Sequence, residues 1–499
     1  MDSAIQLNLS VKEFETIAEN CTKPLIIPLC TALPEAPLPS SEYGFILESL
    51  DTKRRDARYS VMGGMEPVLT ISIGETLGLI GDERYVACAR RAPVGKTPVD
   101  TIRSVVDAFT VCAENTPEFT GCFAGYFSYD LVYALFDQLS EHRRGVNETP
   151  LAEFMLTRES VVIDHDENRS YLFSYPLITE DSIPSEEYRK AEQRIRERVS
   201  RISVQEKSAF PDHPSVRPAA APSSANLTQA VFEERVRQAR EYVHAGEILQ
   251  TVISWRMKCA YTAPPISLYS ALREVNPSNY MYFLDFGKRQ VIGSSPEMLV
   301  RVEGKTVTTV PPIAGTRPRG RNGEEDIELA RDLLADKKEC AEHLMLVDLA
   351  RNDLGRVCKY GSVAPPETFM DVEKFSHVQH IVSRVSGELR DDCDRFDAFV
   401  SCFPAGTVSG APKIRAMQVI DELEDEKRGY LCRSGRLHRL NGDLNLAIAI
   451  RTVIVEDGQA AVQTGAGIVA DSVPEKEYAE TMMKAGAMLA AIRMAEERS

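Results

Sequence analysis

Residues 207–228 divide the chain into two parts of different character. The stretch reads KSAFPDHPSVRPAAAPSSANLT, which is rich in proline, alanine and serine and lacks helical or strand periodicity. This composition is typical of a linker or a long surface loop. We therefore expect an N-terminal domain over residues 1–206 and a second domain over residues 229–499, which holds nearly all of the glycine-containing motifs.

The N-terminal part alternates short strand patterns with helical ones. We expect a helix at 11–21, a hairpin at 160–175 and a charged helix at 185–205. Short apolar runs predict successive strands at 45–50, 68–74, 78–82 and 85–91.

The second part has longer helical patterns. Thr228 is the expected N-cap of an amphipathic helix that ends near Gly246 and leads into a strand at 250–257. A long helical stretch is expected at 324–351, a strand–turn–strand at 445–470, and a closing helix that begins at Pro474.

Charge and composition exclude several classes of partner. The 499 residues include 58 basic and 74 acidic side chains, a net charge of −16, which argues against a nucleic-acid or anionic-membrane partner. No apolar run approaches the ~18 residues needed to span a membrane, and the start lacks a signal-peptide pattern. The 11 cysteines contain no CxxC pair, so we expect reduced thiols and a cytoplasmic location.

The stretch PPIAGTRPRG (311–320) carries a glycine turn followed by arginines at alternate positions, Arg317, Arg319 and Arg321. Guanidinium groups suit the recognition of carboxylates. On the residues alone, an ordinary basic loop remains the favoured interpretation. In a chain this acidic, an anionic substrate would need a locally basic pocket, so clustered arginines mean more here than in a basic protein.

PIAGTRPRG (312–320) and AEHLMLVDLARND (341–353) resemble the large, chorismate-binding subunits of anthranilate synthase (component I), within the chorismate-utilising enzyme family. The resemblance spans residues 40–495. It implies an α+β fold in which two face-packed antiparallel β-sheets are flanked by helices, with the N-terminal part adding strands to the same sandwich. It further implies a carbon–oxygen lyase that converts chorismate and ammonia to anthranilate and pyruvate, the first committed step of tryptophan biosynthesis.

Two pairs of acids at helical spacing could meet at a metal ion. Glu339 and Glu342 share one helix face, and Glu477 and Glu480 share another. Such pairs are usually surface features, but here each borders an apolar segment, and hard oxygen ligands suit Mg²⁺. The resemblance implies that Glu342 and Glu480 hold the Mg²⁺ that receives the ring carboxylate of chorismate, with Glu477 behind them.

Arg451 stands alone in an apolar strand pattern, AIAIRTVIV. A buried arginine needs an internal carboxylate or a bound anion, and the pattern alone favours the internal salt bridge. The resemblance instead makes it the clamp on the enolpyruvyl carboxylate, together with amides in TGAGIV. The full set of expected substrate-binding residues is Gly315, Thr316, Tyr430, Arg451, Gly465, Ala466 and Gly467.

Three residues are expected to act on the reacting ring. A lone histidine such as His380 is more often structural, yet the resemblance places it near the departing hydroxyl, where a group that titrates near neutral pH is useful. Thr407, in the glycine-rich turn GTVSGAP, is expected beside the ring. Glu297, in SSPEML, is expected in the wall of the active site.

Two positions distinguish this chain from related activities. Relatives that add water to chorismate carry a lysine as general base where Gln250 stands, and aminodeoxychorismate synthases typically carry a nucleophilic lysine where Ala314 stands. A further set resembles a tryptophan feedback site: Ser49, Asn279, Tyr280 and Met281.

The nitrogen source and one atypical segment leave alternatives open. No GxCxG nucleophile segment is present, so ammonia is expected from a partner glutamine amidotransferase subunit (component II). Residues 431–440 hold three arginines and a histidine where the family has a glycine-rich strand. The alternatives are an aminodeoxychorismate synthase component I, or a catalytically impaired subunit that binds chorismate or tryptophan and regulates a partner.

Overall fold

The structure is a computed structural model. It describes residues 5–19, 24–50, 58–117, 119, 121–142, 149–204, 222, 224–363, 369–374, 378–429, 434–439 and 442–499. For residues 140–142, 203–204, 314, 316 and 434–439 it describes the backbone alone. Residues 207–221 and 223 lie outside this set, so the expected linker and the domain boundary stay a prediction.

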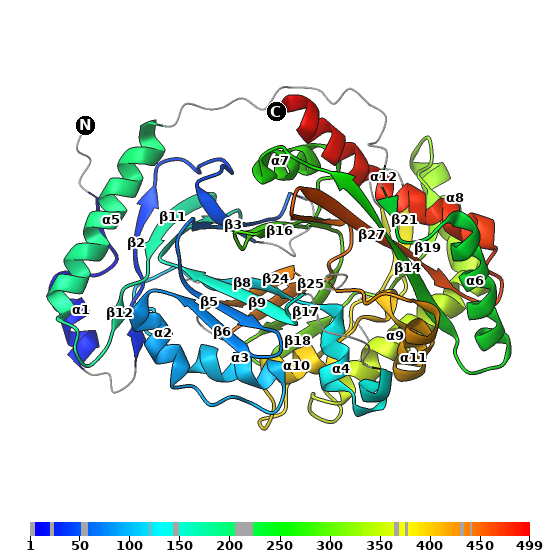
Figure 1. The fold of residues 1–499 in the computed structure, drawn as a ribbon, viewed down its shortest axis with the longest axis horizontal. Coiled ribbons are helices and arrows are strands. Elements are labelled where there is room, and N and C mark those ends of the chain that lie inside the picture. Colours follow the sequence, from blue (N-terminus) through cyan, green and yellow to red (C-terminus); the bar gives the residue numbers. More distant parts are fainter. Residues whose placement is uncertain are drawn as a thin grey trace.

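Two large antiparallel sheets form the centre of the molecule, one above the other in Figure 1. Among the described residues the upper sheet has twelve strands, in the order β13 (Ser224–Ala225), β14 (Gln250–Ala260), β27 (Gln459–Ile468), β26 (Thr452–Glu456), β16 (Arg289–Ser295), β15 (Tyr280–Asp285), β3 (Tyr43–Glu48), β4 (Tyr59–Gly64), β10 (Glu159–Asp164), β11 (Arg169–Ser174) and β2 (Leu29–Leu33), with β23 (Gly410–Ala411) paired to β14. The lower sheet has nine: β22 (Ser386–Glu388), β18 (Thr306–Thr309), β17 (Met298–Glu303), β25 (Leu444–Ala447), β24 (Ser434–Arg439), β8 (Cys122–Phe127), β9 (Ala152–Thr157), β5 (Pro67–Ile73) and β6 (Leu77–Gly81).

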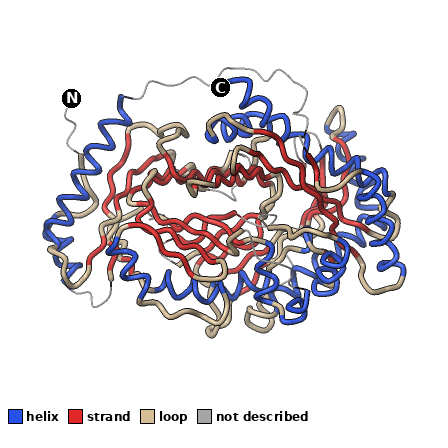
Figure 2. Tube along the Cα trace, in the orientation of Figure 1, coloured by secondary structure: helices blue, strands red, loops and turns tan. Residues whose placement is uncertain are grey.

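Two small sheets complete the described strands, in the orders β12 (Leu177–Ile178), β1 (Leu25–Ile26), β7 (Thr110–Val111) and β19 (Ile313–Pro318), β21 (Val378–Val382), β20 (Asp371–Lys374). Helices lie outside the two large sheets (Figure 2). They are α1 (Val11–Glu19), α2 (Glu83–Arg90), α3 (Pro98–Asp107), α4 (Val132–Leu135), α5 (Pro184–Val204), α6 (Gln229–His244), α7 (Pro265–Val275), α8 (Gly323–Ala335), α9 (Lys337–Gly355), α10 (Arg395–Cys402), α11 (Lys413–Leu423) and α12 (Pro474–Arg498), with 3-10 turns at Tyr129–Leu131, Asp137–His142 and η3 (Gly406–Val408).

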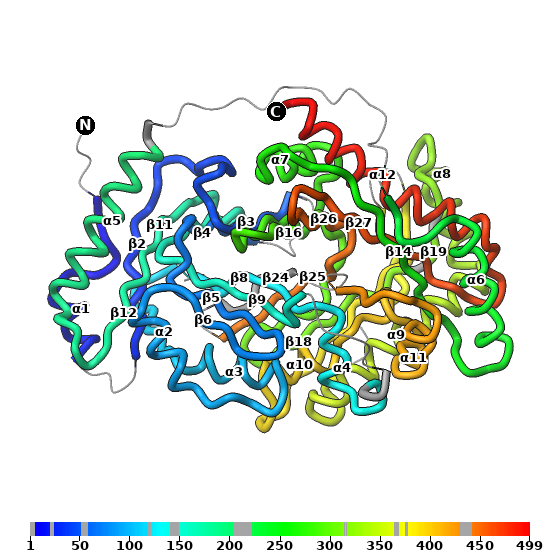
Figure 3. The backbone as a smooth tube through the Cα atoms, in the orientation of Figure 1, coloured from blue at the N-terminus to red at the C-terminus, as the bar shows by residue number. Residues whose placement is uncertain are grey.

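Strands from both parts of the chain share both sheets, as Figure 3 shows by the mixture of blue and cyan with green and orange strands. In the upper sheet β15 pairs with β3, so that Met281 lies opposite Glu48. In the lower sheet β24 pairs with β8. A core that includes Phe45, Phe154 and Leu299 fills the space between the sheets. The expected α+β fold with face-packed sheets is therefore confirmed.

Two expected elements were assigned wrongly. Residues 85–90 belong to helix α2 and not to a strand, and Arg91 is its C-cap, because Asp82 caps the start of the helix by accepting a hydrogen bond from the Arg84 amide. The expected helix at 324–351 is two helices, α8 and α9, divided at Asp336, whose carboxylate accepts hydrogen bonds from the first amides of α9. In both cases a short polar cap overrides the apolar pattern. By contrast, Thr228 caps α6 as expected.

The chain passes between the two large sheets several times, and two of these crossings lie at neighbouring places. It leaves the upper sheet at the end of β16 and enters the lower sheet with β17. It returns between β25 and β26, so the apolar run around Arg451 is two strands and not one. Within the described ranges no helix is long and apolar enough to cross a lipid bilayer.

Candidate active site

The two crossings hold Glu297 and Arg451. The Glu297 carbonyl accepts a hydrogen bond from the Ile448 amide at 3.0 Å, and the Arg451 carbonyl accepts one from the Ser294 amide at 3.1 Å. Arg451 has a φ of 53°, a left-handed conformation that interrupts the extended backbone between β25 and β26. The crossings therefore bring together two residues that lie far apart in the sequence.

Glu297 lies between Thr407 and Arg451. The Thr407 hydroxyl donates to Glu297 Oε2 at 3.2 Å, from the turn η3. Burial raises the pKa of Glu297, while the Thr407 hydrogen bond and the charge of Arg451 act in the opposite direction. The raised pKa favours the protonated form of this carboxyl group more than in free glutamate, which suits acid–base work.

Arg451 presents a cation to the site. The residue is exposed, and its Nη1 atom donates to Asn276 Oδ1 at 3.4 Å. Loss of hydration at the guanidinium lowers the pKa of Arg451, and the charge of Glu297 acts in the opposite direction. Within the described part of the chain no carboxylate pairs with it at ion-pair distance, so the internal salt bridge favoured by the sequence pattern is not formed there. Its donors suit a bound anion.

The glycines of β27 form an open wall beside β14. Gly465, Ala466 and Gly467 lie opposite Ser254, Ile253 and Val252. The ladder between β26 and β27 ends at Val462. Beyond that residue, and among the described residues, the second edge of β27 has no strand partner, so its backbone groups can face a ligand.

Gln250 lies against the same wall. A Cβ atom placed on Gly467 would approach Gln250 Nε2 to 2.4 Å, so the glycine leaves the space that the side-chain amide occupies. Lys484 of α12 joins this wall to the carboxylates of the same helix. Its Nζ atom donates a hydrogen bond to the Gly465 carbonyl at 3.2 Å and pairs with Glu480 at 2.7 Å. The sequence reasoning missed Lys484, although its i,i+4 spacing from Glu480 is a recognisable signal.

His380 and Gly315 meet in the small sheet of β19, β21 and β20. His380 Nδ1 lies 2.8 Å from the Gly315 carbonyl. A carbonyl can only accept, so Nδ1 carries the proton and fixes the tautomer of the ring. Gly315 has a φ of 70°, and a Cβ atom there would lie 3.1 Å from Glu339 Oε2. The tight turn thus connects His380 to the acidic helix α9.

The arginines that follow Gly315 are engaged by the protein. Arg317 pairs with Asp332 at 2.7 Å, Arg319 with Asp326 at 2.6 Å and Arg321 with Glu325 at 3.0 Å. These three arginines therefore have acidic partners within the protein, and Arg317 belongs to strand β19 and not to a loop. The side chains of Ala314 and Thr316, and Tyr430 altogether, lie outside the described residues.

Helices α9 and α12 place their carboxylates near one another. Burial raises the pKa of Glu342, and the charges of Glu339 and Glu480 raise it further. Burial also raises the pKa of Glu477, with Glu480 again adding to the effect. Among the described residues no group of three or more His, Cys, Asp or Glu side chains has metal-binding geometry. Two mutually repelling carboxylates fit Mg²⁺, which keeps several waters and is commonly held by one or two carboxylates plus a ligand.

The residues expected to bind tryptophan come together at the β3–β15 pair. Ser49 directly follows β3, and the Leu50 amide donates to the Ser278 carbonyl at 3.2 Å. Asn279 is 7% exposed, and its Oδ1 atom has no hydrogen-bond partner among the described residues. Nearby, the buried Glu48 accepts hydrogen bonds from Tyr269 at 2.5 Å and Arg273 at 3.0 Å.

Asn276 joins this group to the active site, and the sequence reasoning missed it. Its side chain donates to Ser294 at 3.1 Å and accepts from Arg451 at 3.4 Å. It belongs to the same segment, NPSNYM, as Asn279, Tyr280 and Met281.

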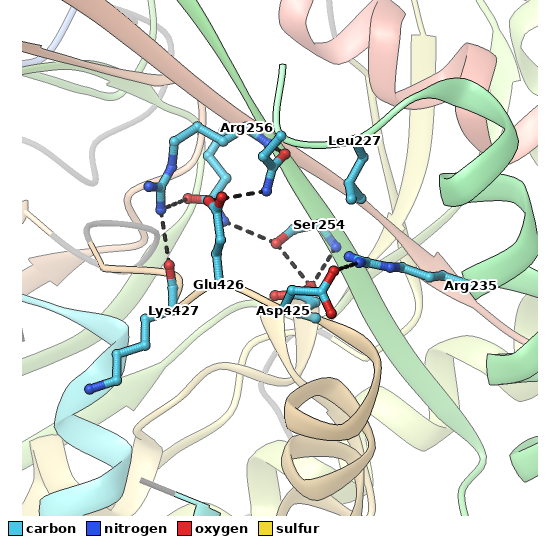
Figure 4. A pocket seen from close by; sticks show the side chains of 10 residues that line it. Leu227, Arg235, Ser254, Arg256, Asp425, Glu426 and Lys427 are labelled. Atoms are coloured by element: carbon cyan, nitrogen blue, oxygen red, sulfur yellow. Dashed lines mark hydrogen bonds and ion pairs between the residues drawn. The ribbon is translucent and has the colours of Figure 1, made fainter. Parts of the chain in front are cut away.

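A polar pocket further along β14 is shown in Figure 4. Its charged side chains are paired within the protein: Arg235 with Asp425, and Arg256 with the carbonyls of Lys427 and Arg428 at 3.1 and 3.0 Å. Because these charges already have partners, the pocket is a less suitable anion site than the surroundings of Arg451.

Comparisons with known proteins agree with this geometry. Residues 76–490 match the model of the chorismate binding enzyme family. The chain is 42% identical to anthranilate synthase component 1 of Aquifex aeolicus over 99% of both chains, and 42% identical to that of Acetivibrio thermocellus over 91% of this chain and 90% of the relative. The crystal structure of anthranilate synthase component I from Streptococcus pneumoniae covers 91% of this chain and 95% of its own, with 34% identity and a TM-score of 0.69. The chain therefore belongs to the anthranilate synthase component I family of chorismate-utilising enzymes.

Proposed function

We propose that this chain is the large subunit of an anthranilate synthase, which converts chorismate and ammonia to anthranilate, pyruvate and water. The observation that carries the proposal is the meeting of Arg451, Glu297 and Thr407 at the two sheet crossings, next to the glycine wall of β27. Chorismate has two carboxylates, and the site offers two places for them: the Arg451 cation and the carboxylate pair of α9 and α12.

The protein's own groups orient the substrate. The Arg451 guanidinium and the backbone of Gly465–Gly467 hold the enolpyruvyl carboxylate, because charge-assisted hydrogen bonds favour an anion here. Glu342 and Glu480, with Glu477 behind them, would hold Mg²⁺. The ion supplies positive charge for the ring carboxylate when it is bound. The ring then lies between Thr407 and His380.

Amination at ring carbon two requires departure of the hydroxyl at carbon four, and elimination of pyruvate then gives the aromatic product. His380 assists the departure by giving a proton to the leaving oxygen. Glu297, whose pKa is raised by burial, takes up or gives a proton on the other side of the ring. Gln250 is a neutral amide and cannot act as a base for water, which leaves ammonia as the nucleophile.

Ammonia comes from a partner glutamine amidotransferase subunit in the cytoplasm. Tryptophan inhibits by binding beside Ser49, Asn279, Tyr280 and Met281. The unpaired Asn279 Oδ1 is a suitable acceptor for its α-amino group, and Asn276 carries the effect to Arg451.

The test is anthranilate fluorescence from the purified chain with chorismate, Mg²⁺ and ammonium sulfate at mildly alkaline pH. A rising signal that tryptophan suppresses supports both the activity and the inhibition. A non-aromatic amino product would instead identify an aminodeoxychorismate synthase. Binding of chorismate without any product would identify an impaired subunit.

A further inference from the structure

A buried ion pair lies directly behind the proposed active site. Arg428 is 2% exposed and Glu424 is 9% exposed. Arg428 Nε donates to Glu424 Oε2 at 2.8 Å, and Nη2 donates to Oε1 at 2.6 Å. The Ser254 amide and hydroxyl also donate to Glu424 Oε1, at 2.7 and 3.1 Å. The pair is thereby fixed to strand β14.

The remaining donors of Arg428 reach two backbone carbonyls. Nη1 donates to the Val408 carbonyl at 2.7 Å, and Nη2 donates to the Val252 carbonyl at 2.6 Å. The Val252 amide in turn donates to the Ser409 carbonyl at 3.0 Å. Val408 directly follows Thr407, and Val252 lies opposite Gly467. One guanidinium therefore ties the turn that carries Thr407 to the strand that carries Gln250.

The Arg428 side chain and backbone are held from other directions as well. Its guanidinium lies 4.8 Å from the centre of the Tyr129 ring. Arg256 donates to the Arg428 carbonyl at 3.0 Å from the strand that crosses Figure 4. The Tyr129 amide donates to the Gly429 carbonyl at 2.9 Å. The guanidinium has little freedom to move.

Stability alone is a weak explanation for this arrangement. Buried ion pairs lose solvation, and apolar replacements are often no less stable. The planar guanidinium does provide several donors in fixed directions, which no other side chain offers. The guanidinium of Arg428 therefore serves to hold the segments around it in a fixed geometry.

We infer that Arg428 is a positioning residue for the reaction: through Val408 and Val252 it fixes the distance between Thr407 and Gln250 at the substrate site. The inference rests on the proposed function. It assigns Arg428 no contact with the substrate.

The test begins with Arg428→Lys, which keeps the charge opposite Glu424 but lacks the planar fork. Anthranilate formation is measured as kcat and as KM for chorismate. We expect kcat to fall on the order of 100-fold, the effect of a misplacement near 1 Å. The KM should stay within about threefold, because the carboxylate contacts are made by other residues.

A milder variant and a matched control accompany it. Ser254→Ala removes one hydrogen bond to Glu424. Because this change is milder, the variant should fold even if Arg428→Lys does not. Its loss of kcat should be smaller than that of Arg428→Lys. Arg415→Lys is the control: Arg415 also pairs with two carboxylates, Glu247 at 2.6 Å and Glu422 at 2.8 Å, on the outer side of α11. Its kcat should equal that of the wild type.

Hydrogen exchange of the segment 404–411 gives a readout that does not depend on activity. Faster exchange there in Arg428→Lys or Ser254→Ala, together with the loss of kcat, supports the inference. Wild-type kcat in both variants overturns it, and so does unchanged exchange in the segment. If the wild-type chain made no anthranilate, the proposed function would fail, and the exchange result alone would decide whether Arg428 holds the turn.

Discussion

Arg451 shows how one residue acquires its role from its surroundings. Its left-handed backbone places it between two strands of different sheets. The described residues around it offer an amide oxygen and a nearby carboxylate, but no ion pair. A cation in this position is stabilised when an anion binds, so its contribution is to substrate recognition more than to folding.

Replacing Arg451 by glutamine should therefore affect catalysis and leave stability almost unchanged. A charge-assisted hydrogen bond contributes ~1.5–3 kcal/mol, so kcat/KM for chorismate should fall by roughly 10- to 100-fold. Steady-state kinetics and thermal unfolding of the same preparation measure the two effects. Unaltered kcat/KM in a folded variant would show that the substrate carboxylate binds elsewhere.

The hairpin of β26 and β27 shows why element boundaries matter for the site. Gly465 and Gly467 project to the same face of β27, but they meet different atoms. A Cβ atom on Gly465 would approach the Ile253 carbonyl to 2.8 Å, whereas one on Gly467 would meet the end of the Gln250 side chain. Backbone cannot move aside, but a glutamine side chain can rotate.

Alanine at these two positions should separate stability from activity. Gly465→Ala should lower the unfolding temperature, since overpacking against the backbone costs about 1–3 kcal/mol. Gly467→Ala should change the unfolding temperature little and reduce kcat, because it displaces the Gln250 amide. Thermal unfolding and anthranilate assays on both variants test the contrast. Equal loss of stability in the two would contradict it.

The helices α9 and α12 form a second pair of elements whose charges predict a pH effect. The pKa values of Glu342 and Glu477 are raised, so the folded state favours their protonated forms. Without Mg²⁺, these two groups therefore stabilise the folded state below about pH 4.3, the ordinary pKa of glutamate. It is lost as pH rises through the raised values.

Mg²⁺ should counteract this loss, because it binds the ionised carboxylates. The increase in unfolding temperature on adding Mg²⁺ should grow as pH rises through the same window. At a free Mg²⁺ concentration of 100 times Kd, the expected gain in the free energy of unfolding is about 2.7 kcal/mol. Glu342→Gln should abolish the increase. Glu475→Gln, an exposed neighbour on α12, should keep it. An equal Mg²⁺ effect in both variants would place the ion elsewhere.

At the scale of the whole molecule, the two parts of the chain complete each other's sheets. Residues 224–499 contain β15 and β24, whose partners β3 and β8 come from the N-terminal part. Separation would expose one edge in each sheet and open the core between them. Exposed sheet edges favour aggregation.

The fragment 224–499 alone should therefore fail to fold, and co-expression with residues 1–206 should restore a soluble complex. Size-exclusion chromatography and circular dichroism measure both outcomes. A soluble, cooperatively unfolding fragment 224–499 would show that the second part is independent of the first.

The sequence by itself determined the family and the helices with clear start signals, such as the Thr228 cap of α6 and Pro474 in the first turn of α12. Long motifs and local signals of this kind are readable in order along the chain. The sequence could not show that the run around Arg451 is divided between two sheets, since an apolar pattern does not reveal which sheet a strand joins. It likewise could not show which arginines are free. Arg317 and Arg319 are paired with acids of α8, and Arg428 is buried behind the Thr407 turn. Only the tertiary structure decides this, because pairing of charges depends on contacts between segments far apart in the sequence.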